Sequence, residues 1–260
     1  MPARTTATLT PEALRALIAQ PEPVLCLDIG NSRAKACLFA EGQLVAEDRH
    51  FTPATALEWV ERYQPVGSIV CAVGEGKEAF LEILQGPTHC LEAGLHLRLP
   101  FENLYRSPTL GPDRIAAVAG AMLHHAPPLL ALDAGTCLTY DVLDADGRYI
   151  GGAISPGLVM RLRALNQFTA GLPLLSPAEE APLAGLSTED CMMSGALNGI
   201  VFEVQAFQQR LAEQNPGLTT VLCGGGAYVF AHRLAEPIFV LPNLVPEGLL
   251  LLYWYQVATA

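Results

Sequence analysis

Two segments of the sequence, far apart in the chain, each place an aspartate and a glycine directly after an apolar run. One is LCLDIGNSRAKACLFAEG at residues 25–42, and the other is LALDAGTCLTYDVLDADG at residues 130–147. A carboxylate at a strand end can hold a hydrated cation that bridges phosphate oxygens. A glycine beside it lets a backbone N–H approach a phosphate closely. If the two turns face one another, they predict a clamp for a polyphosphate.

The candidate ligands in this clamp are carboxylate, amide, hydroxyl, ammonium and backbone groups. They are Asp28, Gly30, Asn31, Ser32 and Lys35 in the first turn, and Asp133, Gly135 and Thr136 in the second. Either turn alone is more often an ordinary hairpin turn, because Asp-Gly pairs are common there. Two copies in matched contexts, followed by a third glycine-rich turn at CGGGA (223–227), favour phosphate binding. The sequence contains neither a P-loop nor a G-x-G-x-x-G after a strand.

The pattern of apolar runs predicts the elements that position these turns. In the first part of the chain we expect strands at 23–30, 32–40, 44–51 and 66–73, with helices at 55–63 and 111–125. From Leu129 a similar series begins again, with strands ending at Asp133 and Val142, strands at 148–154 and from 219, and helices within 157–214 and at 247–257. A repeated series of elements indicates internal duplication.

The predicted boundaries follow from this duplication. We expect an N-terminal extension at residues 1–22, one half at 23–130 and a second half at 131–260. The extension contains a short helix, for which Thr10 is the N-cap and Pro11 the first helical residue.

Composition excludes several kinds of partner. The 260 residues are 51% hydrophobic and 16% charged, which is typical of a globular protein with a large core. The formal net charge is -11 with only 15 Lys and Arg, so we expect no nucleic-acid partner. No secretory signal begins the chain and its C-terminal apolar run is too short to span a bilayer, so we expect no membrane association. None of the seven cysteines forms a C-x-x-C pair, so we expect a reduced, cytoplasmic protein.

Eight short motifs occur in order along the chain. They are DIGNSRAK (28–35), YRSPTLGPDR (105–114), LDAGTCLTYDV (132–142), GGAISPG (151–157), TAGLP (169–173), LSTEDCMMSG (186–195), CGGGA (223–227) and NLVPEGL (243–249). Together they resemble the type III pantothenate kinase family, from about Val24 to the C-terminal helix. The resemblance implies an α/β protein with a duplicated ribonuclease H-like fold, the actin-like ATPase fold, with two similar halves around a nucleotide cleft.

The resemblance also implies a reaction. The γ-phosphate of ATP would pass to the primary hydroxyl of pantothenate, forming 4'-phosphopantothenate in the first step of coenzyme A biosynthesis. Asp113 corresponds to the general base, and Tyr105, Gly111, Pro112 and Arg114 would line the pantothenate site with it. From the residues alone, Asp113 is equally well placed to cap a helix and pair with Arg114. The other motifs favour the catalytic role.

Nucleotide and metal contacts follow from the same resemblance. One stretch corresponds to an ATP loop, namely Asp28, Ile29, Gly30, Asn31, Ser32, Arg33, Ala34 and Lys35. Asp28 would act on Mg²⁺ through water, Asp133 would bind a monovalent cation such as K⁺ or NH₄⁺, and Thr136 would contact a phosphate. Thr188 would complete the pantothenate site of a partner subunit, which implies a homodimer. Without the resemblance, Thr188 is a candidate N-cap of a helix.

Two alternative functions stay open. A non-catalytic regulator similar to the Bvg accessory factor would keep the fold without the reaction, and another small-molecule kinase of the superfamily would use a different substrate. The presence of Asp28, Asp113, Arg114 and Asp133 together favours an active kinase over a regulator. Cys223 stands where the family commonly has a threonine, which removes a hydroxyl near the expected nucleotide.

Overall fold

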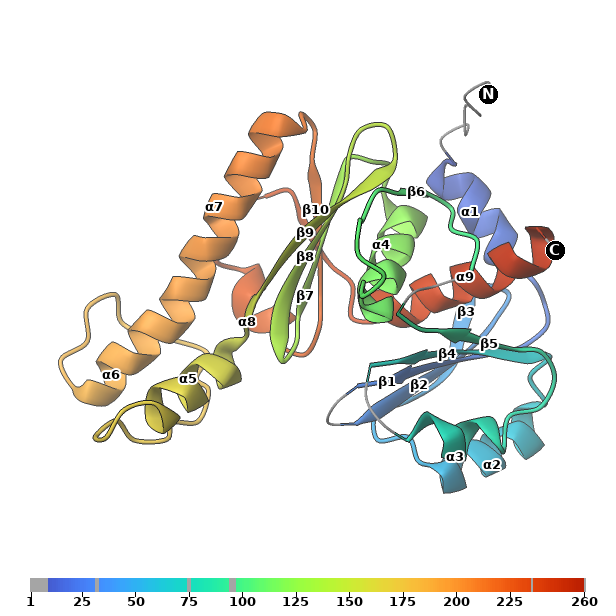
Figure 1. Ribbon diagram of the computed structural model, residues 1–260, viewed down its shortest axis with the longest axis horizontal. Helices are drawn as coiled ribbons and strands as arrows, with labels where there is room; N and C mark the ends of the chain where they lie inside the picture. Colours follow the sequence, from blue (N-terminus) through green and yellow to red (C-terminus); the bar gives the residue numbers. More distant parts are fainter. Residues whose placement is uncertain (1–8, 31–32, 74–75, 94–96, 235, 260) are drawn as a thin grey trace. The chain divides into compact units, whose positions relative to one another are not determined.

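Two β-sheets with the same strand order organise the chain (Figure 1). The computed structural model describes residues 9–30, 33–73, 76–93, 97–234 and 236–259. The chain divides into two compact units. The first consists of residues 1–127, 146–150 and 243–260, and the second of residues 128–145 and 151–242.

The first unit is built around a five-stranded sheet of order β3-β2-β1-β4-β5. Its strands are β1 (Val24–Ile29), β2 (Ala34–Ala40), β3 (Gln43–Asp48), β4 (Gly67–Ala72) and β5 (Thr88–Leu91). β2 is antiparallel to β1 and β3, whereas β4 runs parallel to β1 and β5. β1 and β4 are almost continuous buried runs, as expected for central strands covered on both faces.

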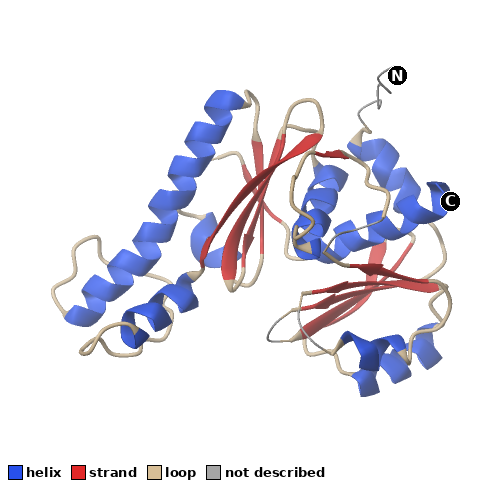
Figure 2. Cartoon of the chain, viewed as in Figure 1, coloured by secondary structure: helices blue, strands red, loops and turns tan. Residues whose placement is uncertain are grey.

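Helices cover both faces of this first sheet (Figure 2). On one face lie α2 (Pro53–Tyr63) and α3 (Lys77–Leu81). Phe80 of α3 stacks on Phe51, with ring centroids 5.9 Å apart, and both rings belong to a core that includes alternate residues of β1. The amphipathic helix predicted at 55–63 is therefore confirmed, with its N-terminus two residues earlier than expected.

On the other face α4 (Pro112–His124) crosses α9 (Leu244–Thr259). A Cβ atom at Gly248 would lie 1.8 Å from the carbonyl oxygen of Ala116, so glycine is required for the two backbones to touch. The apolar run of α9 is buried against α4 and the central strands. Among the residues that the structure describes, no helix is both long and apolar enough to cross a membrane.

The N-terminal helix α1 (Pro11–Ile18) packs on α4 and α9. It begins after Thr10, whose hydroxyl accepts a hydrogen bond from the backbone N of Ala13 at 3.3 Å, as the sequence predicts. Arg15 donates from Nη1 to the carbonyl oxygen of Leu123 at 2.7 Å. α1 thereby satisfies a carbonyl that α4 leaves open at its C-terminus.

The two units differ from the predicted linear halves at residues 128–130 and 146–150 and, most extensively, at α9. The predicted second half, 131–260, contains α9, whereas α9 packs with the first unit. The physical reason is the close helix contact through Gly248, which buries α9 against α4 and the first sheet. The boundaries expected from the sequence stay a prediction: an extension at 1–22 and duplicated halves at 23–130 and 131–260.

A second sheet repeats the topology of the first. Its strands are β7 (Leu129–Ala134), β8 (Cys137–Leu143), β9 (Arg148–Pro156), β10 (Thr219–Cys223) and β11 (Ile238–Val240). Their order is β9-β8-β7-β10-β11, which matches the first sheet strand for strand. β8 is antiparallel to β7, and β10 is parallel to β7 and β11. The predicted duplicated α/β fold is therefore confirmed. β6 (Glu102–Asn103) pairs with Arg148 and Tyr149, the part of β9 that belongs to the first unit.

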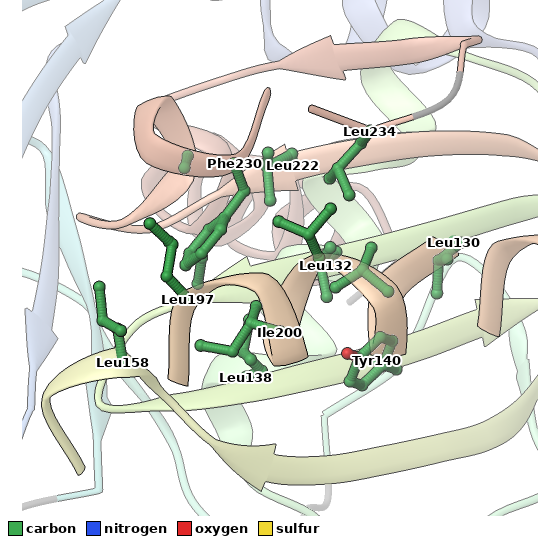
Figure 3. Close-up of a cluster of buried hydrophobic side chains, with 14 of the residues drawn as sticks. Leu130, Leu132, Leu138, Tyr140, Leu158, Leu197, Ile200, Leu222, Phe230 and Leu234 are labelled. Atoms are coloured by element: carbon green, nitrogen blue, oxygen red, sulfur yellow. The ribbon is translucent and has the colours of Figure 1, made fainter. Parts of the chain in front are cut away.

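Helices that follow β9 and β10 cover one face of the second unit's sheet. They are α5 (Leu158–Gln167), α6 (Thr188–Met193), the π-helix η1 (Ser194–Asn198), α7 (Gly199–Gln214) and α8 (Ala227–Ala231). Leu130 and Leu132, alternate residues of β7, meet Leu197 and Ile200 from these helices in one buried core (Figure 3). The period-two alternation of β7 therefore decides which of its side chains enter the core and which face away.

Candidate functional site

The first candidate cluster lies in the first unit, around the fifth residue of β1, Asp28. In the sheet register Asp28 pairs with Lys35 of β2 on one side and with Cys71 of β4 on the other. Register partners project from the same face of a sheet, so these side chains lie beside the Asp28 carboxylate. The following turn is closed by a hydrogen bond of 3.1 Å from the backbone N of Gly30 to the carbonyl oxygen of Arg33.

The predicted ATP loop is buried where it joins its two strands. Ile29 ends β1 and Ala34 begins β2, and both side chains are buried, so they anchor the loop. Arg33 is exposed and Gly30 is half-buried. Asn31 and Ser32 lie outside the described residues. Within the described part of this loop, Arg33 is the exposed residue.

Asp113 lies in the first turn of α4, directly after Pro112. Its Oδ1 accepts a hydrogen bond from the backbone N of Arg114 at 3.0 Å. Gly111 is the N-cap and has no side chain to cap the helix; a Cβ there would lie 2.5 Å from Asp113 Oδ1. Asp113 thus satisfies one open N–H of the helix start, as the alternative interpretation expects, although the N-cap position itself is Gly111.

Asp28 and Asp113 bring two negative charges into one partly buried site. Burial and the Asp113 carboxylate raise the pKa of Asp28 to about 6, although the Lys35 ammonium acts in the opposite direction. Burial also raises the pKa of Asp113, against the lowering effect of the Arg114 backbone N–H and charge. The pKa of the Cys71 thiol is raised by burial and then by both carboxylates. Perturbed groups of this kind cluster at functional sites.

Arg114 follows Asp113 in α4 and contacts the Tyr105 ring. Arg114 is only 6% exposed, and its guanidinium carbon lies 5.8 Å from the centroid of the Tyr105 ring, within cation–π range. Tyr105 is also fixed by the Tyr149 ring, 6.1 Å away between centroids, and by a 2.9 Å hydrogen bond from its backbone N to Asn103 Oδ1. A pocket of about 340 Å³ opens between this loop and Ile115. The structure therefore brings Tyr105, Gly111, Pro112, Asp113 and Arg114 together.

Lys35 contacts two residues, Asn243 and Glu47, that are not among the predicted site residues. Its Nζ donates to Asn243 Oδ1 at 2.7 Å and lies 3.4 Å from Glu47 Oε1. Glu47 also accepts from Arg49 Nε at 2.6 Å. The NLVPEGL motif contains Asn243 and is the signal that could have identified this contact. No motif marks Glu47, which approaches from β3.

The second candidate turn, in the second unit, repeats the first at the level of single residues. Asp133 is the fifth residue of β7 and pairs with Thr139 of β8 and Cys223 of β10. Asp28 holds the same place in β1 and also pairs with a cysteine, Cys71, on the parallel neighbour. The two aspartates that the sequence pattern matched are therefore equivalent in the duplicated topology.

Backbone groups surround the Asp133 carboxylate. A Cβ at Gly224 would lie 2.2 Å from Asp133 Oδ1, so the glycine turn after β10 packs directly on this oxygen. Gly224 also has φ of +88°, a conformation that side chains other than glycine rarely adopt. Thr136 is exposed at the tip of the turn, and its carbonyl oxygen accepts a hydrogen bond from the backbone N of Gly157 at 3.1 Å.

The donor atoms of both turns fit hard cations. A partly buried carboxylate is the ligand type that such cations prefer. In the described part of the chain, no group of three or more His, Cys, Asp or Glu side chains could hold a metal ion. A cation at Asp28 or Asp133 would therefore complete its coordination with backbone oxygens, water or ligand oxygens.

Thr188 lies in a groove of about 1190 Å³ in the second unit, lined mostly by apolar side chains of α5, α6 and η1. The N-cap of α6 is Ser187, whose Oγ accepts from the backbone N of Asp190 at 3.0 Å. The alternative role of Thr188 as an N-cap is therefore wrong, because α6 begins at Thr188 itself, one residue earlier than an N-cap at Thr188 requires. Thr188 is exposed, and the neighbouring Leu186 is 100% exposed.

These features define a class of protein: an α/β protein with the duplicated ribonuclease H-like fold and an acidic turn in each unit. The sequence profile described as type III pantothenate kinase matches residues 24–210. The chain belongs to the type III pantothenate kinase family.

Three curated relatives named type III pantothenate kinase illustrate the similarity. The protein of Phocaeicola vulgatus is 39% identical, with 86% of this chain and 95% of the relative covered. The protein of Cytophaga hutchinsonii is 37% identical, with 86% and 96% covered. The protein of Flavobacterium psychrophilum is 33% identical, with 90% and 99% covered.

A solved structure is also similar to the chain. It is a Campylobacter jejuni protein described as a conserved Baf family activator of transcription, with a TM-score of 0.58 and 21% identity. The match covers 86% of this chain and 94% of that protein. At this identity the likeness shows the fold alone.

Proposed function

We propose that the chain is an ATP-dependent kinase that phosphorylates pantothenate to 4'-phosphopantothenate, the first step of coenzyme A biosynthesis. Membership of the family and the names of the relatives support this reaction. The observation that carries the site is the pair of partly buried carboxylates, Asp28 and Asp113, with the buried Arg114 beside them.

Asp113 is the proposed general base for the substrate hydroxyl. The backbone N–H of Arg114 holds its Oδ1 in place, and burial raises its pKa, which makes it a better proton acceptor near neutral pH. Tyr105, Gly111, Pro112 and Arg114 position pantothenate around it. The Arg114 guanidinium suits either the carboxylate of the substrate or the charge that develops on the phosphate. Phosphoryl transfer depends on such positioning and charge neutralisation more than on covalent chemistry.

The first turn and Thr136 are the proposed nucleotide contacts. The backbone from Asp28 to Lys35, including Ile29, Gly30, Arg33 and Ala34, would follow the phosphates, and Lys35 would add positive charge. Asp28 would hold Mg²⁺ through water, and Asp133 would hold a monovalent cation, K⁺ or NH₄⁺. Such cations neutralise phosphate oxygens when they are bound.

We further propose a homodimer and a cytoplasmic location. The apolar groove that contains Thr188 and the fully exposed Leu186 support an interface between two copies of the chain. In that dimer Thr188 would complete the pantothenate site of the partner subunit. All seven cysteines are free thiols, which suits a reducing compartment.

A coupled ADP-release assay with pantothenate tests the reaction, with potassium compared against tetramethylammonium. Asp113→Asn should lower kcat by roughly 10²- to 10⁴-fold, the usual contribution of a general base. Asp48→Asn is the matched control, because Asp48 also accepts a backbone hydrogen bond, from His50 at 2.7 Å, in the same unit. Nucleotide binding without turnover would indicate a regulator instead. ADP release that does not depend on pantothenate would indicate another substrate.

A further inference from the structure

We infer that the ion pair between Arg161 and Glu203 positions the backbone of the turn at Gly135–Thr136 and thereby sets the affinity for the phosphates of ATP. The inference rests on the proposed function, because it takes this turn to be a phosphate contact. Arg161 and Glu203 are positioning residues, because they act on the turn through the backbone between them and it. All the residues involved belong to the second unit.

Glu203 of α7 is fixed from two sides. Tyr140 of β8 donates from its hydroxyl to Glu203 Oε1 at 2.9 Å, and Arg161 of α5 donates from Nη2 to Oε2 at 2.5 Å. The Tyr140 ring is buried in the core that Figure 3 shows, and its centroid lies 4.5 Å from that of Phe207. Burial raises the pKa of Glu203, but hydrogen bonds from Arg161, Ser155 and Tyr140 outweigh it, so the carboxylate stays ionised at neutral pH.

Arg161 connects this anchored carboxylate to the end of β9. Its Nε donates to the carbonyl oxygen of Pro156 at 2.8 Å, and its Nη2 donates to Ser155 Oγ at 3.0 Å. A guanidinium is a rigid planar fork, so its position on Glu203 determines where Ser155 and Pro156 lie. The two charged side chains are 20% and 24% exposed, and a charge-assisted contact of this kind holds its geometry better than one in open solvent.

Gly157 transmits this position to the phosphate turn. Its backbone N donates to the carbonyl oxygen of Thr136 at 3.1 Å. A Cβ at Gly157 would lie 2.5 Å from the carbonyl oxygen of Gly135 and 2.7 Å from that of Thr136. The backbone at Gly157 therefore packs directly against the backbone of the turn. A displacement of Pro156 must therefore move the peptide that carries Thr136. Displacement of a binding group by about 1 Å is enough to cost up to roughly a hundredfold in function.

Kinetics and nucleotide binding of Arg161→Ala, Arg161→Lys and Glu203→Gln test the inference. Arg161→Ala should raise the KM for ATP and the Kd for Mg²⁺–AMP-PNP by roughly ten- to a hundredfold, and leave the KM for pantothenate within about twofold. Arg161→Lys should recover part of the lost nucleotide affinity. Lysine keeps a positive charge to pair with the Glu203 carboxylate, but it cannot bind both Ser155 and Pro156 as the guanidinium does. Arg233→Ala is the matched control, since Arg233 also donates to a backbone carbonyl of the second unit, that of Glu179.

Several outcomes overturn the inference. Unchanged nucleotide affinity in a folded Arg161→Ala protein overturns it. A change confined to the KM for pantothenate also overturns it, because Arg161 lines the groove around Thr188 and would then act there instead. If Arg161→Ala does not fold, the lysine and Glu203→Gln variants decide the same comparison. If the wild type binds AMP-PNP but never phosphorylates pantothenate, the proposed function fails while the Kd values still judge the positioning role. A wild type that binds no nucleotide overturns both.

Discussion

Asp28→Asn tests the electrostatics of the first turn without any measurement of turnover. Burial and Asp113 raise the pKa of Asp28 from its ordinary value of 3.8 to about 6. Each pKa unit corresponds to about 1.36 kcal/mol, so keeping Asp28 ionised costs the folded state about 3 kcal/mol at neutral pH. An asparagine carries no charge and should therefore make the ligand-free protein more stable, while it removes the proposed cation ligand.

The sign of the pH dependence follows from proton linkage. Below the ordinary pKa, Asp28 is protonated in the folded and unfolded chains, and the wild type has its full stability from this group. As the pH rises through about 6, the unfolded chain has already lost its proton and the wild type loses that stability. The asparagine variant should therefore gain about 1 kcal/mol over the wild type at pH 4.5 and about 3 kcal/mol at pH 7.5.

Urea denaturation at these two pH values, with EDTA present, measures the gain in the free energy of unfolding. Glu22→Gln is the control, because it removes the charge of an exposed carboxylate elsewhere in the same unit. In an Asp113→Asn background the gain from Asp28→Asn should be smaller, since the repulsion between the two carboxylates is already gone. A variant that is no more stable than the wild type at pH 7.5, or a gain that does not change with pH, would refute this reasoning.

Two further predictions concern packing and assembly. Gly248→Ala should lower the free energy of unfolding by about 3 kcal/mol or more, because its Cβ would overlap the backbone of α4, whereas Gly171→Ala, with open space around it, should leave the melting temperature unchanged. An unchanged melting temperature for Gly248→Ala would contradict the helix contact. Leu186→Asp should raise the dimer Kd at least about tenfold in sedimentation without altering the fold, since Leu186 is fully exposed; Leu44→Asp, on an exposed strand of the first unit, is the control. A Leu186→Asp protein that still sediments as a dimer would exclude this groove as the interface.

The long elements and the duplication could be predicted from the sequence, whereas the edge strands could not. β1, α2 and α4 are long enough for their apolar periodicity to identify them. β5 and β11, which complete the repeated strand order, have only four and three residues, and most of their side chains are half-buried. In so short a run the periodicity of apolar residues cannot be recognised. Such a segment becomes a strand only because it pairs with the neighbouring strand.

The same distinction applies to the candidate site: some of its residues could be predicted from the sequence, and some of its contacts could not. Asp28 and Asp113 follow from local motifs, because each lies at a strand end or helix start that the sequence marks. The hydrogen bond from Lys35 to Asn243 joins residues 208 positions apart, and the pairing of Lys35 with Glu47 depends on the register of β2 and β3. Local spacing carries no information about such contacts. The first arises because the segment before α9 returns to the first sheet, and the second because β3 pairs with β2.

The two aspartate turns share one duplicated geometry but differ in their surroundings. Asp28 and Asp133 share a strand position and a cysteine neighbour, so the duplication explains where they lie. Their surroundings differ: Asp28 has the ionisable groups of Lys35 and Asp113 beside it, whereas Asp133 has the backbone of Gly224. Side-chain charges respond to protons and ligands, while a glycine backbone keeps its dipoles fixed. The first turn is therefore suited to the steps in which charge changes, and the second to holding a cation or phosphate in one place.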